Sequence, residues 1–429
     1  MKHLFLAFLL LLTFYAYSND TIVVMQYNLL YYGQNNNWCN DQNNDLGTKN
    51  LYIRTILNEV KPDILTVCEF GKDEALLDVF LDNNLNVNGI NSWKSSSVIN
   101  NANSNIINAI FYNSDKLRMK KHSVAQSYLR DIDVFEMYFN TDGLVWGDTI
   151  DLICVVAHLK SSSGTQNENK RKLMIENTLE YLEYNCPDEN ILLMGDFNFY
   201  SSDEEAYQLM TDSYLYPRAY FVDPLVDYAI GHWHNNPDFQ RYHTQSTNLE
   251  GSNCGSGGGL DDRFDFIMMS PKISAGTDGV KYVNGSYCAL GQDGKHFNNS
   301  VNAEPYNTEL SKEILDALYH NSDHLPVLMR LDVNADIGVD NDNDSYFNVF
   351  ISPNPAKDIL KLYIDNDKDA IAKIMIFNIL GENVLLDEIQ YSHAQKEYYL
   401  DIEQLRSGMY FVNIMLEEVH SGMMKLIVE

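Results

Sequence analysis

The chain has 429 residues, a length that predicts two domains rather than a single core. Its 60 acidic and 30 basic residues give a formal net charge of −30, which excludes a global attraction to nucleic acid or anionic lipid, so a polyanionic substrate must be held locally or through bound cations. A hydrophobic fraction of 45% also excludes a disordered chain.

The first residues have the pattern of a Sec signal peptide. Lys2 and His3 precede an apolar run, and small residues at positions 16 and 18 predict cleavage after Ser18. A membrane anchor would need about 20 apolar residues, and this run is shorter. We therefore expect residues 1–18 to be removed and the protein to be secreted without stable membrane insertion.

From Thr21 onward, short β-rich runs alternate with helical stretches. Apolar or alternating runs predict strands over 22–28, 64–69, 108–112, 134–139, 150–159, 191–196, 264–269 and 327–333. Apolar residues at helical spacing predict helices over 46–60, 167–185 and 204–210. This mixture predicts two packed sheets with helices outside, in a domain spanning residues 19–333.

The remaining residues predict a linker and a second domain. Residues 334–346 include "NADIGVDNDNDS", which is acidic and almost without apolar residues. A calcium loop is the alternative interpretation, but Ile337 stands where that loop needs glycine and Asn343 where it needs glutamate. Residues 347–429 alternate strands with turns and carry no cluster of His, Cys or carboxylate residues, so they predict a small β-sandwich without chemistry.

The six cysteines would meet an oxidising compartment after secretion. Cys68 and Cys154 lie inside apolar, strand-like runs and are expected to be buried. Cys254 and Cys288 lie in polar loops that flank one predicted strand. They are the best candidates for a disulfide.

The predicted strands of the first domain share one feature, a polar side chain at or just beyond the end. These residues are Asn28, Glu69, His158, Asp196 with Asn198, Asp265, and Asp323 with His324. One aspartate or histidine at a strand end is usually structural, but six such ends are poorly explained by accident. In an extended chain Asp196 and Asn198 would also point the same way.

These residue types indicate a particular chemistry. Hard oxygen ligands such as Glu69 suit Mg²⁺, Mn²⁺ or Ca²⁺ and not zinc. An imidazole beside a carboxylate suits general acid–base catalysis or stabilisation of a phosphate. Together they predict the metal-assisted attack of water on a phosphoester.

Residues from about 21 to 333 resemble the endonuclease/exonuclease/phosphatase superfamily. The motifs that carry the resemblance span residues 26–28, 68–69, 157–160, 195–198, 263–267 and 322–326. The resemblance implies a four-layer α/β sandwich, in which two packed mixed β-sheets are flanked by helices. It also implies a divalent-metal-dependent phosphoesterase, with Mg²⁺ as the expected cofactor and Mn²⁺ or Ca²⁺ as alternatives.

The resemblance also implies roles for individual residues. Glu69 is the expected principal metal ligand, supported by Asn28, with Asp323 as a further ligand. Asp196 and Asn198 are expected to hold the nucleophile and the scissile phosphate.

The remaining roles concern the phosphate. His324, paired with Asp265, is expected to contact it, and His158 on the other side is an acid or a stabiliser. Arg130 falls near the place of a phosphate-binding arginine. Lys160 is either a second phosphate contact or a solvated loop lysine.

Departures from the family pattern leave the substrate open. Gly71 stands where the deoxyribonuclease branch has an arginine, and no glutamate ahead of residues 108–112 is positioned to partner His158. An extracellular nuclease acting on nucleic acid is the favoured interpretation. A phosphatase or sphingomyelinase-type enzyme and a non-catalytic, surface-displayed binding module are the alternatives.

The segment 347–429 resembles the C-terminal sorting domain of type IX secretion substrates. The resemblance rests on residues 353–355, 378–381, 407–410 and 425–428. It implies that the type IX secretion machinery is a partner and that the protein is released or displayed at the cell surface, where we expect a monomer. A carbohydrate-binding β-sandwich is the structural alternative.

Overall fold

The computed structural model describes residues 20–36, 38–140, 149–251, 254–333, 348–365, 369–378, 383–416 and 419–428. The expected signal peptide and the expected linker lie outside the described residues. The chain divides into two compact units, Met1–Ile337 and Gly338–Glu429. The larger unit thus contains every residue predicted to carry chemistry.

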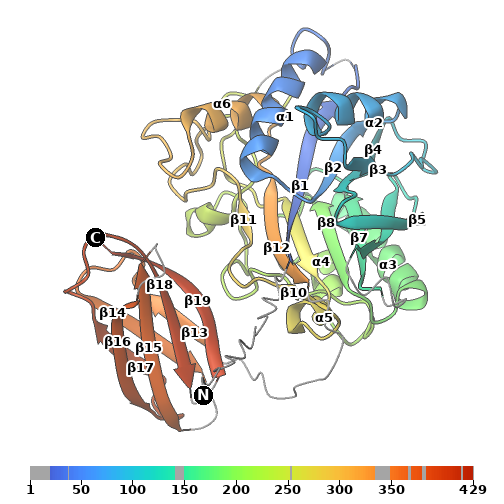
Figure 1. The fold of residues 1–429 in the computed structure, drawn as a ribbon. Helices are drawn as coiled ribbons and strands as arrows, with labels where there is room; N and C mark the ends of the chain where they lie inside the picture. Colours follow the sequence, from blue (N-terminus) through green and yellow to red (C-terminus); the bar gives the residue numbers. More distant parts are fainter. Residues whose placement is uncertain are drawn as a thin grey trace, which may run out of the picture. The chain divides into compact units, whose positions relative to one another are not determined.

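The first sheet of the larger unit joins its earliest and latest strands (Figure 1). Seven strands take the order β10-β12-β1-β2-β4-β3, with β11 paired to β12. The sheet is mixed, because β1 pairs antiparallel with β12 and parallel with β2. The bounds are β1 (Asp20–Tyr32), β2 (Ile64–Gly71), β3 (Trp93–Ser95), β4 (Ile106–Asn113), β10 (Val280–Tyr282), β11 (Cys288–Ala289) and β12 (Val327–Val333).

The second sheet is formed by five strands in the order β5-β6-β7-β8-β9. It is also mixed, because β7 and β8 are parallel and the other neighbours are antiparallel. The bounds are β5 (Leu117–Gln126), β6 (Ile132–Phe139), β7 (Asp151–His158), β8 (Ile191–Asp196) and β9 (Asp265–Met269).

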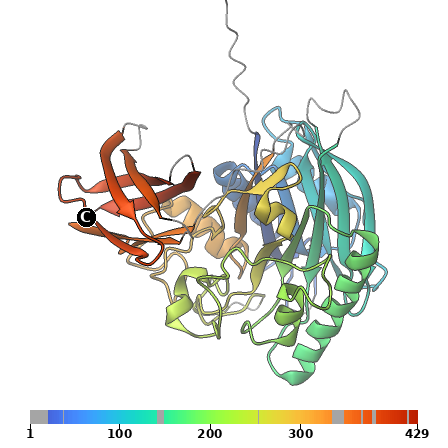
Figure 2. The same cartoon turned by 90° about the horizontal axis from the view of Figure 1, so that it is seen from below.

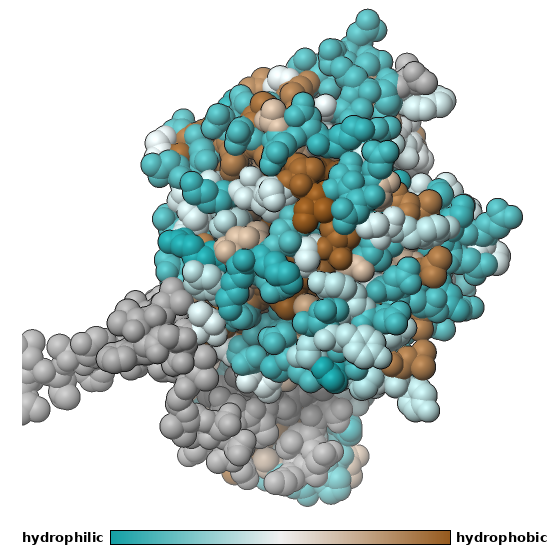
Figure 3. Space-filling model, turned by 90° about the vertical axis from the view of Figure 1, so that its right-hand side faces the viewer, coloured by the Kyte–Doolittle hydropathy of each residue, from teal (hydrophilic) through white to brown (hydrophobic). Residues whose placement is uncertain are grey.

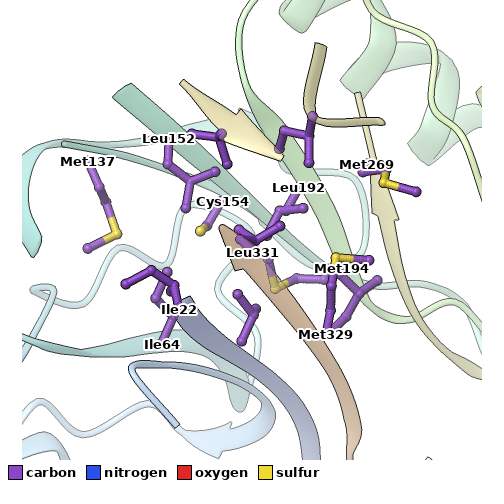
Figure 4. Packing of buried hydrophobic residues seen from close by; sticks show 14 of the residues in the cluster. Ile22, Ile64, Met137, Leu152, Cys154, Leu192, Met194, Met269, Met329 and Leu331 are labelled. Carbon is purple, nitrogen blue, oxygen red and sulfur yellow. The ribbon is translucent and has the colours of Figure 1, made fainter. Parts of the chain in front are cut away.

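The two sheets pack face to face through apolar side chains. Ile22 and Ile64 from the first sheet share one buried cluster with Leu152 and Leu192 from the second, as Figure 4 shows. Strands buried on both faces need near-continuous apolar sequence, and all six residues of β8 are buried. This cluster is the central core of the unit.

Helices cover the outer faces of both sheets (Figure 2). On the first sheet, α1 (Leu46–Val60), α2 (Ala75–Phe80) and α6 (Lys312–Asn321) share a second cluster with β1, β2 and β4. On the second sheet, α3 (Thr165–Asn185) and α4 (Glu205–Thr211) share a third cluster with the strands from β6 to β9. The predicted four-layer α/β sandwich is therefore confirmed.

The eight predicted strands and three predicted helices are present, but other elements were not predicted. They are β3, β5, β10, β11, α2, α5 (Pro271–Ala275), α6, a π-helical turn over Leu81–Leu85 and a 3₁₀ helix over Pro237–Tyr242. The edge strand β5 has the polar sequence LRMKKHSVAQ and buries only its two ends, so it lacks the apolar alternation that marks a half-buried strand. Helix α6 carries a capping signal, because the Ser311 side chain accepts a hydrogen bond from the backbone N–H of Ile314.

The disulfide differs from the prediction. It joins Cys39 to Cys254 across a sequence separation of 215, so the expected pairing of Cys254 with Cys288 is wrong. Cys39 lies in the loop between β1 and α1, which reaches residue 254 only through the fold, whereas Cys288 is a free cysteine on β11. Cys68 and Cys154 are free and buried, as predicted.

The smaller unit is the predicted β-sandwich. A three-stranded sheet, β13-β14-β17, and a four-stranded sheet, β16-β15-β18-β19, share one apolar cluster. The bounds are β13 (Asn348–Ser352), β14 (Ile359–Asp365), β15 (Ala370–Asn378), β16 (Asn383–Tyr391), β17 (Glu397–Asp401), β18 (Gly408–Leu416) and β19 (Val419–Val428).

Figure 3 draws one face of the molecule, coloured by the hydropathy of each residue. On the face drawn in Figure 3, hydrophilic side chains surround a smaller group of hydrophobic ones near the middle. Within the described parts of the chain, no helix combines the length and the apolar character needed to span a bilayer.

A buried ion pair supports the start of β9. The Arg263 guanidinium donates to both carboxylate oxygens of Asp223, at 2.9 and 2.8 Å, and both side chains are almost completely buried. Asp223 also accepts a hydrogen bond from the Tyr207 hydroxyl. Arg263 belongs to the motif 263–267 of the family resemblance, and its contacts show that it supports the fold next to Asp265.

Asp223→Ala is expected to destabilise the larger unit by about 3–5 kcal/mol, because it leaves the Arg263 charge buried without a partner. Urea unfolding followed by tryptophan fluorescence measures this unit alone, since all 4 tryptophans of the chain precede residue 338. The control is Asp316→Ala, which removes an exposed Lys312–Asp316 pair and should cost less than about 1 kcal/mol. Equal losses in the two variants would contradict this role of the pair.

Candidate active site

Three of the predicted site residues form a row across the second sheet. β7 ends at His158, β8 ends at Asp196, and β9 begins at Asp265. His158 pairs with Asp196 in the parallel ladder, and Asp196 pairs with Asp265 in the antiparallel one. Directly paired residues point to the same face of a sheet. The three side chains therefore lie together at one edge.

A glycine lets the first two members of this row approach one another. Gly195 has φ +147°, and a Cβ placed there would lie 1.8 Å from the backbone oxygen of Ala157. No other residue fits that space, so β7 and β8 meet closely just before His158 and Asp196.

Irregular backbone positions the residues that come from the first sheet. The β1–β2 pairing shifts register between Asn28 and Tyr32, and the β2–β4 pairing shifts between Val67 and Phe70. Glu69 lies in the second irregularity with φ +55°, a conformation rarely adopted by residues with a Cβ. Such irregularities re-aim side chains at sheet edges.

Asn28 joins the two sheets. Its amide nitrogen donates to Glu69 Oε1 at 3.2 Å and to Asp196 Oδ2 at 3.0 Å, while its Oδ1 accepts from the Leu30 N–H at 2.9 Å. Asn28 is completely buried. The two carboxylates are thus held at fixed positions by one amide.

The loop between α6 and β12 supplies Asp323 and His324. His324 Nδ1 lies 2.7 Å from Asp265 Oδ2, and the same oxygen accepts from the Thr244 hydroxyl at 2.7 Å. Burial alone would lower the pKa of His324, but the Asp265 and Asp196 carboxylates outweigh it and raise the pKa well above its usual value. The two carboxylates therefore favour the protonated form of this imidazole.

The side chains of Asp196 and Asn198 lie together, although the two residues are not alternate residues of one extended strand. β8 stops at Asp196, and Asn198 has φ +55°. The Asn198 side-chain amide donates to Asp196 Oδ1 at 2.7 Å, and its backbone N–H donates to the same oxygen at 3.2 Å. A turn closed by Asp196 replaces the extended arrangement that was expected. Burial raises the pKa of Asp196.

His158 faces both carboxylates with one nitrogen. Its Nε2 lies 3.5 Å from Asp196 Oδ2 and 3.8 Å from Glu69 Oε1. Within the described parts of the chain its buried Nδ1 has no hydrogen-bond partner, in agreement with the missing glutamate noted in the sequence. Burial and the nearby Arg130 charge lower the pKa of His158 well below its usual value, so this imidazole is neutral.

The acidic groups fit a divalent cation. Glu69 Oε2 and Asp323 Oδ1 are buried oxygens that have no hydrogen-bond partner among the described residues, and ligand atoms of Glu69, His158 and Asp196 lie within 4.8 Å of one another. Burial and then the Asp323 charge raise the pKa of Glu69. A cation bound beside Glu69, His158 and Asp196 would ligate the unpaired Glu69 oxygen and neutralise its charge.

Comparison with known proteins identifies the larger unit. The profile of the endonuclease/exonuclease/phosphatase family matches residues 25–290, which is more than half of the chain. The chain belongs to this family. Its members are divalent-metal-dependent phosphoesterases, so the protein is a phosphoester hydrolase.

The endonuclease/exonuclease/phosphatase unit is followed by a second matched region. Residues 350–429 match a secretion system C-terminal sorting domain, the type IX tail predicted from the sequence. This match supports secretion or display at the cell surface and indicates the type IX machinery as a partner. No curated protein matches the chain significantly.

Solved structures of low sequence identity are similar to the endonuclease/exonuclease/phosphatase unit. A conserved protein of unknown function from Enterococcus faecalis V583 is 15% identical, with 73% of this chain and 100% of that chain covered and a TM-score of 0.45. Truncated TDP2 from Caenorhabditis elegans is 15% identical, with 73% and 98% covered and a TM-score of 0.44. An endonuclease/exonuclease/phosphatase from Beutenbergia cavernae DSM 12333 is 12% identical, with 95% and 100% covered and a TM-score of 0.42.

The two basic residues predicted to bind substrate lie near the end of β7, close to His158 of this endonuclease/exonuclease/phosphatase site. Arg130 donates to the backbone oxygens of Leu159 and His158, at 2.8 and 3.3 Å, and Lys160 donates to the backbone oxygen of Ser161 at 2.7 Å. Both line a cavity of about 500 Å³. These two side chains therefore contribute positive charge to the lining of this cavity.

Three residues that support the endonuclease/exonuclease/phosphatase site were not predicted. Gln245 Nε2 lies 2.6 Å from His324 Nε2 and 3.3 Å from Asp323 Oδ2, and Thr244 contacts Asp265. Buried Lys49 of α1 donates to the backbone oxygen of Asn321, two residues before Asp323. Thr244 and Gln245 lie outside helices and strands, so no periodic sequence pattern could have predicted their positions. Lys49 could not be distinguished in the sequence from the solvent-exposed polar residues of a helix.

Proposed function

We propose that the protein is a secreted, Mg²⁺-dependent phosphodiesterase whose main activity is that of an extracellular nuclease. The convergence of Glu69, Asp196 and His324 from both sheets and one loop carries this proposal, because two carboxylates and one imidazolium meet beside orphaned carboxylate oxygens. Mn²⁺ or Ca²⁺ are the alternative cations.

The proposed metal ligands are Glu69 and Asp323, with Asn28 holding Glu69 in place. Mg²⁺ favours a few carboxylates together with water and substrate phosphate, which suits this small set. A divalent cation supplies Lewis-acid polarisation of phosphoryl oxygens when bound.

The proposed roles of the other residues follow from their contacts. Asp196 and Asn198 orient the attacking water, and Asp196 accepts its proton; the burial that raises its pKa makes it a better acceptor. The His324 imidazolium, held by Asp265, stabilises the negative charge that develops on the phosphate. Neutral His158 lies on the opposite side and donates a hydrogen bond there, while Arg130 and Lys160 bind phosphate oxygens.

The proposed route of export begins with a Sec signal at residues 1–18 and ends with the type IX sorting domain. The mature enzyme would begin at Asn19 and act as a monomer. Mass spectrometry of the exported protein and light scattering measure these two properties.

The purified protein is expected to hydrolyse DNA or RNA with Mg²⁺ or Mn²⁺ and to lose this activity in EDTA. The measurement is a panel of DNA, RNA, sphingomyelin and inositol phosphates, each assayed with metal, with EDTA, and with metal restored. Equal rates in EDTA would contradict metal dependence. A preference for sphingomyelin or inositol phosphates would replace the nuclease with another phosphoesterase, and inactivity on the whole panel would favour the non-catalytic binding module.

A further inference from the structure

The cavity beside the catalytic residues has an unusual lining for a site that only holds phosphate. It measures about 500 Å³ and combines two cations, Arg130 and Lys160, with the aromatic and apolar side chains of Tyr31, Trp38 and Leu129. Arg130 contacts the backbone oxygen of His158, so the cavity begins next to the proposed reacting phosphate.

Trp38 is the feature of this cavity that phosphate binding does not explain. Its side chain is 72% exposed, although tryptophan is normally among the more buried residues. An exposed aromatic ring that lines a cavity offers a face on which another planar group can stack.

The loop that carries Trp38 is braced. Asn36 Oδ1 accepts hydrogen bonds from the backbone N–H groups of both Trp38 and Cys39, at 2.7 and 2.8 Å. The Asn43 amide donates to the Trp38 backbone oxygen at 2.7 Å, and the disulfide from Cys39 to Cys254 fixes the next residue. The backbone that presents the indole is therefore held in place before any ligand arrives, which lowers the entropic cost of stacking.

The rest of the lining suits the polar edge of a nucleobase. Gln34, Asn35 and Asn105 contribute amide groups, which both donate and accept hydrogen bonds as base edges require. An inositol polyphosphate would call for more cations than the two found here. A choline headgroup would be repelled by those same two cations.

We propose that this cavity binds an unpaired nucleobase next to the scissile phosphate, stacked on Trp38, so that single-stranded nucleic acid is the preferred substrate. The proposal rests on the proposed phosphodiesterase function and names its substrate class. In a duplex each base is already stacked and paired, and its ring cannot reach the indole. Duplex binding also relies on many phosphate contacts, which a chain with net charge −30 supplies poorly.

The test compares Trp38→Ala, Trp38→Phe and the unchanged protein on four substrates. These are a single-stranded DNA oligonucleotide, its RNA counterpart, the DNA duplex, and methyl 4-nitrophenyl phosphate, a small diester without a nucleobase. Trp38→Ala should lower kcat/KM on single strands roughly 5- to 150-fold, the range expected for losing one stacked base. It should leave the small diester within twofold, and Trp38→Phe should retain most of the single-strand activity. The unchanged protein should prefer single strands to duplex, and Trp38→Ala should reduce that preference.

Tyr214→Ala is the matched control, because Tyr214 is an 85% exposed aromatic residue that does not line the cavity. Full single-strand activity of Trp38→Ala would overturn the proposal, and so would equal losses on the oligonucleotides and the small diester. Failure of the unchanged protein to cleave any substrate would reject the proposed function instead. Fluorescence anisotropy with a labelled single strand would then decide the stacking proposal alone, since Trp38→Ala should still weaken binding, and unchanged binding would overturn it.

Discussion

His324→Ala is expected to lower kcat roughly 10²–10³-fold while changing KM little, the usual effect of removing one preorganised electrostatic partner. The imidazole is buried, lies 2.7 Å from Asp265 and 3.7 Å from Asp196, and has a strongly raised pKa. Its charge therefore acts on the phosphate most strongly when negative charge develops there, and the loss falls on the transition state.

Asp265, the carboxylate that pairs with His324, provides a second test of this proposed pair. Asp265→Asn should keep the fold and lose much of the same factor, because the imidazole would no longer be held as a cation. The double variant should then be little worse than His324→Ala alone. Steady-state kinetics of the three variants on one substrate decide the matter: losses that multiply would show that Asp265 and His324 act independently.

Asp196→Asn is expected to lower kcat roughly 10²–10⁴-fold, the range for removing a general base. Asp196 accepts hydrogen bonds from Asn28 and Asn198, and one imidazole nitrogen of His158 and one of His324 lie 3.5 and 3.7 Å from its Oδ2. The amide keeps the size of the side chain but cannot take a proton from water. It should therefore bind substrate with nearly unchanged KM.

The matched control for this substitution is Asp227→Asn, an exposed aspartate in the same part of the chain. Its activity should stay within twofold of the unchanged protein. Thermal unfolding of both variants separates a chemical loss from a structural one. An Asp196→Asn enzyme with unaltered kcat would exclude Asp196 as the base.

The strand-end residues could be predicted because each is a polar residue at or near one end of a largely apolar run. A run such as residues 191–194 is fully buried, so the polar residue that follows it must lie at the edge of the sheet. The same argument located Glu69 and His158, and the family motifs supplied their order. Helix α1 was predicted with the bounds that it has, Leu46–Val60, because its buried positions recur at helical spacing.

Other features could not be predicted because they depend on contacts distant in sequence. Thr244 and Gln245 come from irregular chain that lies against Asp265 and Asp323 only in the folded protein. The Cys39–Cys254 pairing likewise needs two loops to meet. The register shifts that aim Glu69 leave no mark in a sequence that reads as a regular strand.

In the proposed mechanism the reaction depends on how β7, β8 and β9 pair, because their pairing places His158, Asp196 and Asp265 in one row. Deleting one residue within β8 would turn Asp196 to the opposite face and separate it from both neighbours at once. The loop that carries Trp38 lies outside these ladders, so its length and composition can change without shifting the row. With the proposed roles, insertions and deletions would be tolerated in the loop that selects the substrate and not in the strands that carry the reacting groups, so the same strands could serve new substrates.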